Sequence, residues 1–200
     1  MHVEYTTDGM KHILDTKKYL LIVDVEHTCT EDGSIPPDMR EIIELGAVLV
    51  CAKSFDVISE FNSLVSPIIH PILSDFCIEL TGINQEQISQ AQPFSAVFER
   101  FIAWLPSSTT DYVFCSWGAY DLDQINIDCN HHNLDEFSPT MKLNLKKGFA
   151  KSQRIKPQVG MRKAFELKGL ELAGKHHRSL ADVQNIVKLL PYIFLQTEKQ

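Results

Sequence analysis

Two acidic residues, Asp24 and Glu26, lie at the end of the apolar run Tyr19–Val25. That run is short and rich in β-branched residues, which predicts a buried strand. Side chains at positions i and i+2 of a strand point to the same face, so the two carboxylates should converge. Like charges in such a place are costly unless cations neutralise them, and hard oxygen ligands suit Mg²⁺ or Mn²⁺. Taken alone, the pair could also be a chance feature of a strand end.

A third acidic residue, Asp121, follows a second short buried strand predicted at Tyr112–Ser116. It comes just after Trp117 and Gly118, where a helix is expected to begin. The alternative is structural, because the helix dipole favours acidic residues in the first turn of any helix.

A histidine and a carboxylate flank the start of the last predicted helix, which Ser179 can cap. His177 precedes this helix and Asp182 lies in its first turn, so the two side chains can face one site. A histidine with a pKa near neutrality is a natural base for activating water. The alternative is a surface histidine beside an unrelated aspartate.

The elements that must position these residues indicate an α/β fold. Three early strands are followed by alternating helices and strands, which predicts a mixed central sheet of about five strands covered by helices on both faces. Residues 1–18 are expected to form a loose arm, and residues 19–195 a single domain. The predicted strands are Tyr19–Val25, Ile42–Cys51, Phe55–Val65 and Tyr112–Ser116, with Met141–Leu145 ambiguous; the predicted helices are Ile72–Leu80, Pro93–Leu105, one after Gly118, Val159–Leu167, and one from Ser179 to a stop at Pro191.

The composition excludes several classes of protein. The 200 residues are 44% hydrophobic and 22% charged, which argues against disorder, collagen and coiled coil. No apolar run approaches the roughly 20 residues of a membrane span, and the N-terminus has no apolar signal core. Five scattered cysteines form no Cys-x-x-Cys pair, which argues against a disulfide framework or a zinc knuckle. We therefore expect a cytoplasmic protein without a membrane partner.

Charge is distributed unevenly along the chain. The net charge is −7, yet residues 142–178 hold eleven Lys or Arg and only two acidic residues. This segregation suggests a basic surface for a polyanion beside an acidic pocket that needs cations. A solvated helical face with lysines on it is the simpler alternative.

The order of the motifs is more specific than any one of them. Asp-x-Glu on the first strand, an aspartate after a Trp-Gly turn and His-x4-Asp at the last helix resemble the DEDDh family of 3′-to-5′ exonucleases over residues 19–190. The segments 24–29, 43–47 and 80–83 resemble its branch of histone-mRNA and enhanced-RNAi exonucleases and KapD-like relatives. The chain departs from the usual pattern at His27, Ser179 and Ala181, none of which is an expected metal ligand.

The resemblance implies a ribonuclease H-like fold and catalysis with two Mg²⁺ ions, which Mn²⁺ could replace. Asp24 would bridge both ions, Glu26 and Asp182 would hold the first, and Asp121 would hold the second. His177 would be the general base. His176 is the rival base, but the family spacing selects His177.

The resemblance also implies residues that bind the substrate. Glu26, His27 and Thr28 should line the pocket for the terminal 3′ hydroxyl, beside His177. Ile83 should wedge against the last base. Two aromatic residues, Trp117 and Tyr120, could stack on a base or could simply pack in the core.

The expected function is therefore metal-dependent hydrolysis of single-stranded nucleic-acid 3′ ends to nucleoside 5′-monophosphates, with RNA favoured on the resemblance alone. The first alternative is a DNA proofreading or repair exonuclease. The second is a non-catalytic RNA-binding adaptor, although all five residues of the catalytic set are present. The sequence leaves open a monomer or a homodimer.

Overall fold

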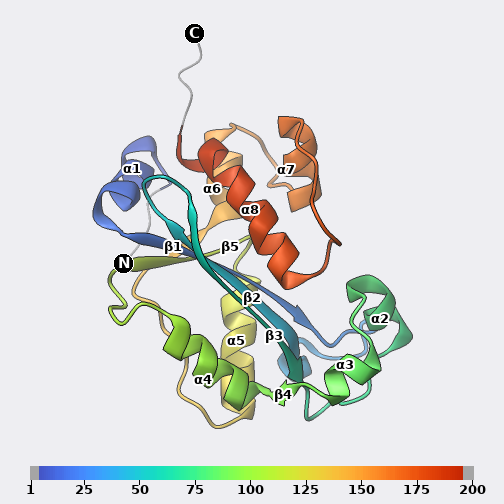
Figure 1. Ribbon diagram of the computed structural model, residues 1–200. Coiled ribbons are helices and arrows are strands. Elements are labelled where there is room, and N and C mark those ends of the chain that lie inside the picture. Colours follow the sequence, from blue (N-terminus) through green and yellow to red (C-terminus); the bar gives the residue numbers. More distant parts are fainter. Residues whose placement is uncertain (1–4, 196–200) are drawn as a thin grey trace.

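The apolar run that begins at Tyr19 forms β1 (Tyr19–His27), the strand on which the sheet is built. In the computed structural model, which describes residues 5–195, β1 pairs antiparallel with β2 and parallel with β5 (Figure 1). The sheet has six strands where about five were expected, because the two-residue strand β4 adds to its edge. Its order is β4 (Gln92–Pro93), β3 (Val57–Ser66), β2 (Ile42–Cys51), β1, β5 (Tyr112–Ser116) and β6 (Lys142–Asn144). The α/β class with a mixed sheet is confirmed.

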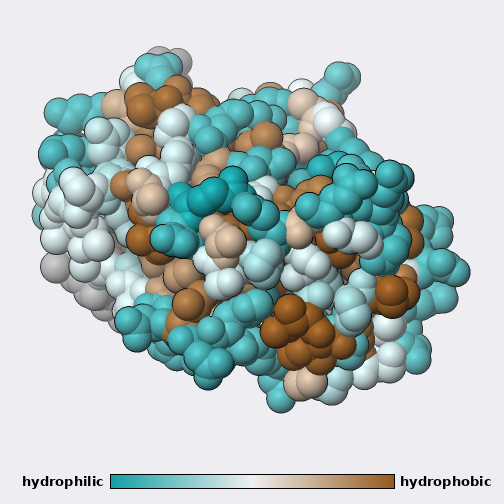
Figure 2. Space-filling model, turned by 60° about the horizontal axis from the view of Figure 1, so that its bottom comes forward, coloured by the Kyte–Doolittle hydropathy of each residue, from teal (hydrophilic) through white to brown (hydrophobic). Residues whose placement is uncertain are grey.

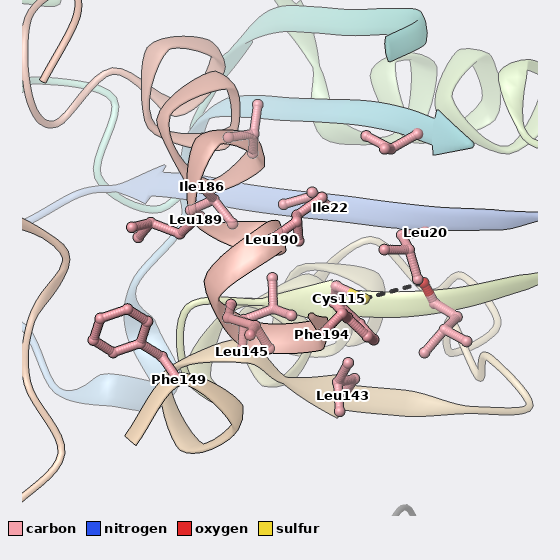
Figure 3. Packing of buried hydrophobic residues seen from close by; sticks show 14 of the residues in the cluster. Leu20, Ile22, Cys115, Leu143, Leu145, Phe149, Ile186, Leu189, Leu190 and Phe194 are labelled. Carbon is pink, nitrogen blue, oxygen red and sulfur yellow. Dashed lines mark hydrogen bonds between the residues drawn. The ribbon is translucent and has the colours of Figure 1, made fainter. Parts of the chain in front are cut away.

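Helices cover both faces of this sheet, because side chains of β1 alternate between two apolar clusters. Leu20 and Ile22 pack under α8 together with α1, α6 and α7 (Figure 3). Leu21 and Val23 face the opposite cluster, which contains α4 and α5. The bounds are α1 (Thr7–Thr16), α4 (Phe94–Trp104), α5 (Tyr120–His131), α6 (Leu145–Ser152), α7 (Met161–Lys168) and α8 (Ser179–Phe194).

A smaller layer lies beyond the carboxyl end of β1. It comprises η1 (Pro37–Met39), α2 (Asp75–Thr81) and α3 (Gln85–Ser89), with a third apolar cluster around Cys77. Gly82 ends α2 in the left-handed conformation, at φ 72°. This confirms Gly82 as the end of the helix predicted over Ile72–Leu80, although the helix begins three residues later.

The N-terminus of α8 is attached to β2 by an ion pair between the half-buried Arg178 and the buried Glu44. Arg178 donates from Nη2 to Glu44 Oε1 at 2.8 Å and from Nε to Oε2 at 3.0 Å. The backbone N–H of Ser179 also donates to Glu44 Oε2, at 3.0 Å. Burial would raise the pKa of Glu44, but these hydrogen bonds outweigh it and leave that pKa below its ordinary value. The Glu44 carboxylate is therefore charged, and both of its oxygen atoms accept hydrogen bonds from the start of α8.

Gly46 lets the helix approach this closely. A Cβ atom built on Gly46 would lie 2.5 Å from the Ser179 carbonyl carbon and 2.6 Å from the Leu180 backbone nitrogen. Gly46 lies directly opposite Asp24 in the β1–β2 pairing, and Glu44 lies opposite Glu26. The docked helix end therefore sits beside the two carboxylates of β1.

The expected loose arm at residues 1–18 is wrong for the part that the structure describes. Thr6 caps α1 by accepting a hydrogen bond from the Gly9 N–H at 3.1 Å. Met10 and Ile13 are buried in the cluster under α8, at 4% and 2% exposure. The signal was a polar cap followed by apolar residues at helical spacing; residues 1–4 lie outside the described residues.

The last helix does not stop at Pro191, as was expected, but continues to Phe194. Proline lacks an N–H, yet the Leu195 N–H still donates to the Pro191 carbonyl at 2.9 Å, and Ile193 and Phe194 bury their side chains. Packing of this final turn outweighs the lost hydrogen bond. Arg178, not Ser179, is the N-cap residue, and the ambiguous segment Met141–Leu145 contains β6.

No helix in residues 5–195 combines the length and apolar character needed to cross a membrane. On the face shown in Figure 2, hydrophobic residues form separate patches within a hydrophilic surface.

The close approach of the α8 backbone to Gly46 predicts that adding a methyl group there destabilises the protein. Gly46→Ala should lower the free energy of unfolding by about 1–3 kcal/mol, because backbone atoms of α8 must move away from β2. Gly160→Ala is the matched control, since a Cβ there meets nothing within 4 Å. Chemical denaturation of both variants measures the difference. Equal stability of the two would contradict the docking described here.

Candidate active site

All five residues expected to carry catalysis line one cavity of about 280 Å³ at the carboxyl end of β1. They come from three separate parts of the chain, β1, the start of α5, and the turn and first residues of α8. The cavity is lined by Asp24, Val25, Glu26, His27, Trp117, Tyr120, Asp121, Met161, His176, His177, Asp182 and Ile186.

Three carboxylates form the centre of the cavity. Oxygen atoms of Asp24, Glu26 and Asp182 all lie within 4.8 Å of one another. Asp24 and Glu26 continue the face of β1 that carries Leu20 and Ile22, and this face points toward α8. The i, i+2 spacing therefore brings the carboxylates of Asp24 and Glu26 together, as predicted.

Burial and mutual repulsion destabilise the charged forms of these acids. The pKa of Glu26 is raised to about 8, first by burial and then by the charges of Asp182 and Glu44. The pKa of Asp24 is also well above its ordinary value, through burial and the nearby Asp121. Such a cluster holds its negative charge at neutral pH only when positive charge is supplied.

Asp121 closes the cluster from the other side of β1. It lies in the first turn of α5, is 7% exposed, and accepts a hydrogen bond from the Val25 N–H at 3.3 Å. Burial raises its pKa to about 6. Its position is thus fixed to the strand that carries the other two acids, beyond what the helix dipole alone would explain.

The two neighbouring histidines contact Asp182 in different ways. The backbone N–H of His177 donates to Asp182 Oδ2 at 3.0 Å. The ring nitrogen Nδ1 of His176 lies 3.0 Å from Asp182 Oδ1. The two rings stack with centroids 4.1 Å apart. Burial and the neighbouring His176 lower the pKa of His177 below 6.5, so its imidazole is mostly neutral at pH 7.

The His177 backbone is in the left-handed region, at φ 64°. A residue other than glycine adopts this conformation rarely, and its cost is tolerated where the surroundings hold it in place. Here the hydrogen bond to Asp182 and the ion pair of the next residue, Arg178, hold the turn. The turn presents both imidazoles to the cavity.

The donor set fits a divalent cation. Carboxylate oxygens are hard ligands, and four acids converge where no lysine or arginine lines the cavity. A second group of potential metal ligands consists of His176, His177 and Asp182, whose ligand atoms also lie within 4.8 Å of one another. Asp182 belongs to both groups, so it joins the acidic centre to the histidines.

Aromatic rings border the acidic centre. Tyr120 is 37% exposed, and its ring lies 5.2 Å from that of His27. The Tyr120 hydroxyl donates to Gln124 Oε1 at 2.6 Å. The Trp117 ring packs 5.8 Å from Phe149, and its buried Nε1 has no hydrogen-bond partner among the described residues. Tyr120 is therefore the better placed of the two for contact with a base.

Two residues expected to bind substrate are not in the cavity. Ile83 is fully buried with Ile43 and Ile88, so its side chain cannot wedge against a base in this structure. Thr28 is 2% exposed, and its hydroxyl accepts a hydrogen bond from the Glu41 N–H at 3.0 Å. Ile83 belongs to the apolar cluster around Cys77 and Thr28 is hydrogen-bonded to Glu41, and the sequence spacing revealed neither contact.

Several residues of the site were missed or given another role by the sequence reasoning. Met161 lines the cavity from the start of α7, inside the basic segment, without a recognisable motif. His176 was treated as a rival base, but it contacts Asp182 directly. Glu44 and Arg178 position α8. The one sequence signal for this role is a glutamate, Glu44, two residues before Gly46 in the otherwise apolar strand β2.

Comparison with known proteins supports this description. The chain is 31% identical to human 3′-5′ exoribonuclease 1 over 179 residues, which covers 86% of this chain and 51% of that protein. It is 31% identical to ERI1 exoribonuclease 2 of Xenopus laevis over 193 residues, covering 86% of this chain and 28% of the relative. The chain thus spans about half, or less, of the length of these curated relatives.

Solved structures agree. The nuclease domain of 3′hExo, a DEDDh family member bound to rAMP, superposes with a TM-score of 0.81 at 30% identity, covering 92% of this chain and 98% of that one. A 3′-exonuclease that recognises the 3′ end of the histone mRNA stem-loop superposes with a TM-score of 0.80 at 30% identity, covering 87% and 80%. A family model described as exonuclease, RNase_T, matches residues 21–190. The expected resemblance and the ribonuclease H-like fold are confirmed: this chain belongs to the RNase_T exonuclease family, on its DEDDh branch.

Proposed function

We propose that this protein is a divalent-metal-dependent 3′-to-5′ exonuclease that shortens single-stranded nucleic acids, with RNA favoured over DNA. The observation that carries the proposal is the meeting of Asp24, Glu26, Asp121, His177 and Asp182 in one cavity. The preference for RNA rests on the relatives, which are named exoribonucleases. A DNA exonuclease is the second candidate, because the five residues in the cavity act on the phosphodiester, which RNA and DNA share.

The carboxylates would hold Mg²⁺ or Mn²⁺, with Asp24 central, Glu26 and Asp182 on one side and Asp121 on the other. Bound cations would neutralise the carboxylates and polarise the phosphodiester. His177 is the general base: its neutral imidazole takes a proton from the attacking water. The water oxygen bonds to phosphorus and the bond from phosphorus to the 3′ oxygen of the preceding nucleotide breaks. That oxygen takes up a proton from solvent to become the new 3′ hydroxyl, and a nucleoside 5′-monophosphate leaves.

The remaining residues of the cavity position the strand end. Glu26 and His27 line the cavity at the end of β1, and we expect them to contact the terminal 3′ hydroxyl. Tyr120 offers a partly exposed ring to the last base, and stacking of this kind contributes about 1–3 kcal/mol per base.

The direct test uses matched RNA and DNA oligonucleotides labelled at the 5′ end. With Mg²⁺ or Mn²⁺, the product ladder should shorten from the 3′ end, and RNA should be degraded faster. Failure to shorten either oligonucleotide with any divalent cation would contradict the proposal, and faster degradation of DNA would favour the second candidate.

Removing the charge of Asp24 should abolish activity without lowering the stability of the protein. Asp24→Asn should abolish detectable cleavage while leaving the metal-free protein as stable as wild type or more so, because repulsion in the cluster falls. Asp123→Asn is the matched control, since Asp123 is an exposed acid in the same turn of α5 as Asp121. Oligonucleotide cleavage and thermal unfolding are the two measurements. Substantial activity in Asp24→Asn would refute the assignment of the metal ligands.

The two histidines should contribute unequally to the rate. His177→Asn keeps a residue that tolerates positive φ, and it should lower the cleavage rate by about 10²–10⁴-fold. In wild type the rate should rise with pH to a plateau through an inflection below 6.5, as the imidazole loses its proton. That inflection should disappear in His177→Asn.

His176→Asn is the comparison for this experiment. It removes a contact to Asp182 but not the proposed base, so the rate should fall less and the pH inflection should remain. A larger loss in His176→Asn than in His177→Asn would show that the general base is misassigned.

The acidic cluster also predicts how stability depends on pH. The pKa of Glu26 is raised from 4.5 to about 8 in the folded protein, so its contribution to stability is fully present below pH 4.5 and is lost as the pH rises to about 8. The metal-free protein should therefore unfold at a lower temperature at pH 8 than at pH 5. Millimolar Mg²⁺ should raise the unfolding temperature more at pH 8 than at pH 5.

Glu26→Gln is the control for the pH effect, because it removes the titrating group. The difference in unfolding temperature between pH 5 and pH 8 should shrink in this variant. An equal effect of Mg²⁺ at both pH values in wild type would contradict a cation site built on these carboxylates.

A further inference from the structure

A second pocket, of about 470 Å³, lies between α6 and the chain that leads into α7. It is distinct from the acidic cavity, with which it shares no residue. We call it the basic pocket; its lining residues are Lys147, Ala150, Lys151, Arg154, Ile155, Lys156 and Gln158.

Among residues 5–195, no carboxylate forms an ion pair with the cations of the basic pocket. The ion pairs found in residues 5–195 join Lys18 to Asp111, Lys163 to Glu166, His176 to Asp182 and Arg178 to Glu44, so none involves this pocket. Residues 145–160 contain no aspartate or glutamate. All four basic side chains of the pocket are exposed. Four unneutralised positive charges around one hollow attract a polyanion.

The pocket is held in shape by its own backbone. The Ile155 N–H donates to the Ala150 carbonyl at 2.9 Å, which closes the end of α6, and Arg154 turns the chain at φ 55°. Ile155 packs against the main core, so the floor of the pocket is apolar while its rim is charged. An apolar floor with a cationic rim suits a ligand that alternates phosphates with flat bases, as a nucleic-acid strand does.

The basic pocket is close to the acidic cavity along the chain. Gln158 lines the pocket and Met161 lines the cavity, and only Val159 and Gly160 separate them. Three residue steps span at most about 11 Å even when fully extended. A strand whose 3′ end enters the acidic cavity could therefore reach the basic pocket within a few nucleotides.

We propose that the basic pocket binds the phosphate backbone of the substrate strand upstream of the cleaved bond. The proposal rests on the proposed exonuclease function. The pocket would strengthen the binding of long strands, while the shortest substrates would occupy the acidic cavity alone.

The test compares the double variant Lys151→Gln/Lys156→Gln with the control Lys11→Gln/Lys53→Gln. Both variants lose two positive charges from exposed lysines, but only the first pair lines the basic pocket. Affinity is measured for a single-stranded RNA of about 12 nucleotides over a range of salt concentrations. Hydrolysis of a trinucleotide by each variant is measured with Mn²⁺, and thermal unfolding verifies the fold.

The double variant should bind the long RNA about tenfold more weakly than wild type or the control, with a salt dependence shallower by about 1 in the slope of log K against log salt. Its hydrolysis of the trinucleotide should be unchanged. Equal affinity of the double variant and wild type would overturn the inference, as would an equal loss in the control. A further outcome is that wild type cleaves neither RNA while the basic-pocket variant still binds the long RNA less tightly than the control does. That result would contradict the exonuclease proposal but support binding of RNA by the basic pocket.

Discussion

The attachment of α8 to β2 is the interaction on which the site depends. Glu44 accepts hydrogen bonds from the Arg178 guanidinium and the Ser179 N–H, while Gly46 leaves room for the helix backbone. These two residues of β2 lie opposite Glu26 and Asp24 of β1. The same contact therefore brings Asp182 and the histidine turn to the two carboxylates, although about 150 residues separate them in the sequence.

This attachment also explains a charge arrangement that would otherwise be unfavourable. Glu26 and Glu44 are cross-strand neighbours, and like charges in that position are destabilising. Arg178 neutralises Glu44 and lowers its pKa, but no ion pair within residues 5–195 involves Glu26, whose pKa is raised to about 8. Glu44 thus has its charge neutralised by the protein itself, whereas Glu26 needs a bound cation to neutralise its charge. The residue that stabilises the helix attachment and the residue that faces the cation site are therefore direct neighbours in the sheet.

Local sequence patterns predicted most of the fold and the convergence of Asp24 and Glu26, whereas the complete acidic set was implied by the resemblance to the DEDDh family. The i, i+2 spacing of Asp24 and Glu26 and the strand Tyr112–Ser116 follow from periodicity, and both are present in the structure. The buried position of Ile83 could not be predicted, because it depends on how α2 and α3 pack against β2. The direct contact of His176 with Asp182 was missed for a similar reason, since it needs the left-handed turn at His177. Tertiary packing, rather than propensity, decided these cases.

The proposed function requires the carboxylates of the acidic cavity to hold a divalent cation. Anomalous scattering from crystals of the wild-type protein soaked in Mn²⁺ tests it most directly. We expect manganese between the carboxylates of Asp24, Glu26 and Asp182, with Asp121 facing the same cluster. Manganese bound instead by His176 and His177 away from Asp24, or an absence of manganese from the cavity, would contradict it.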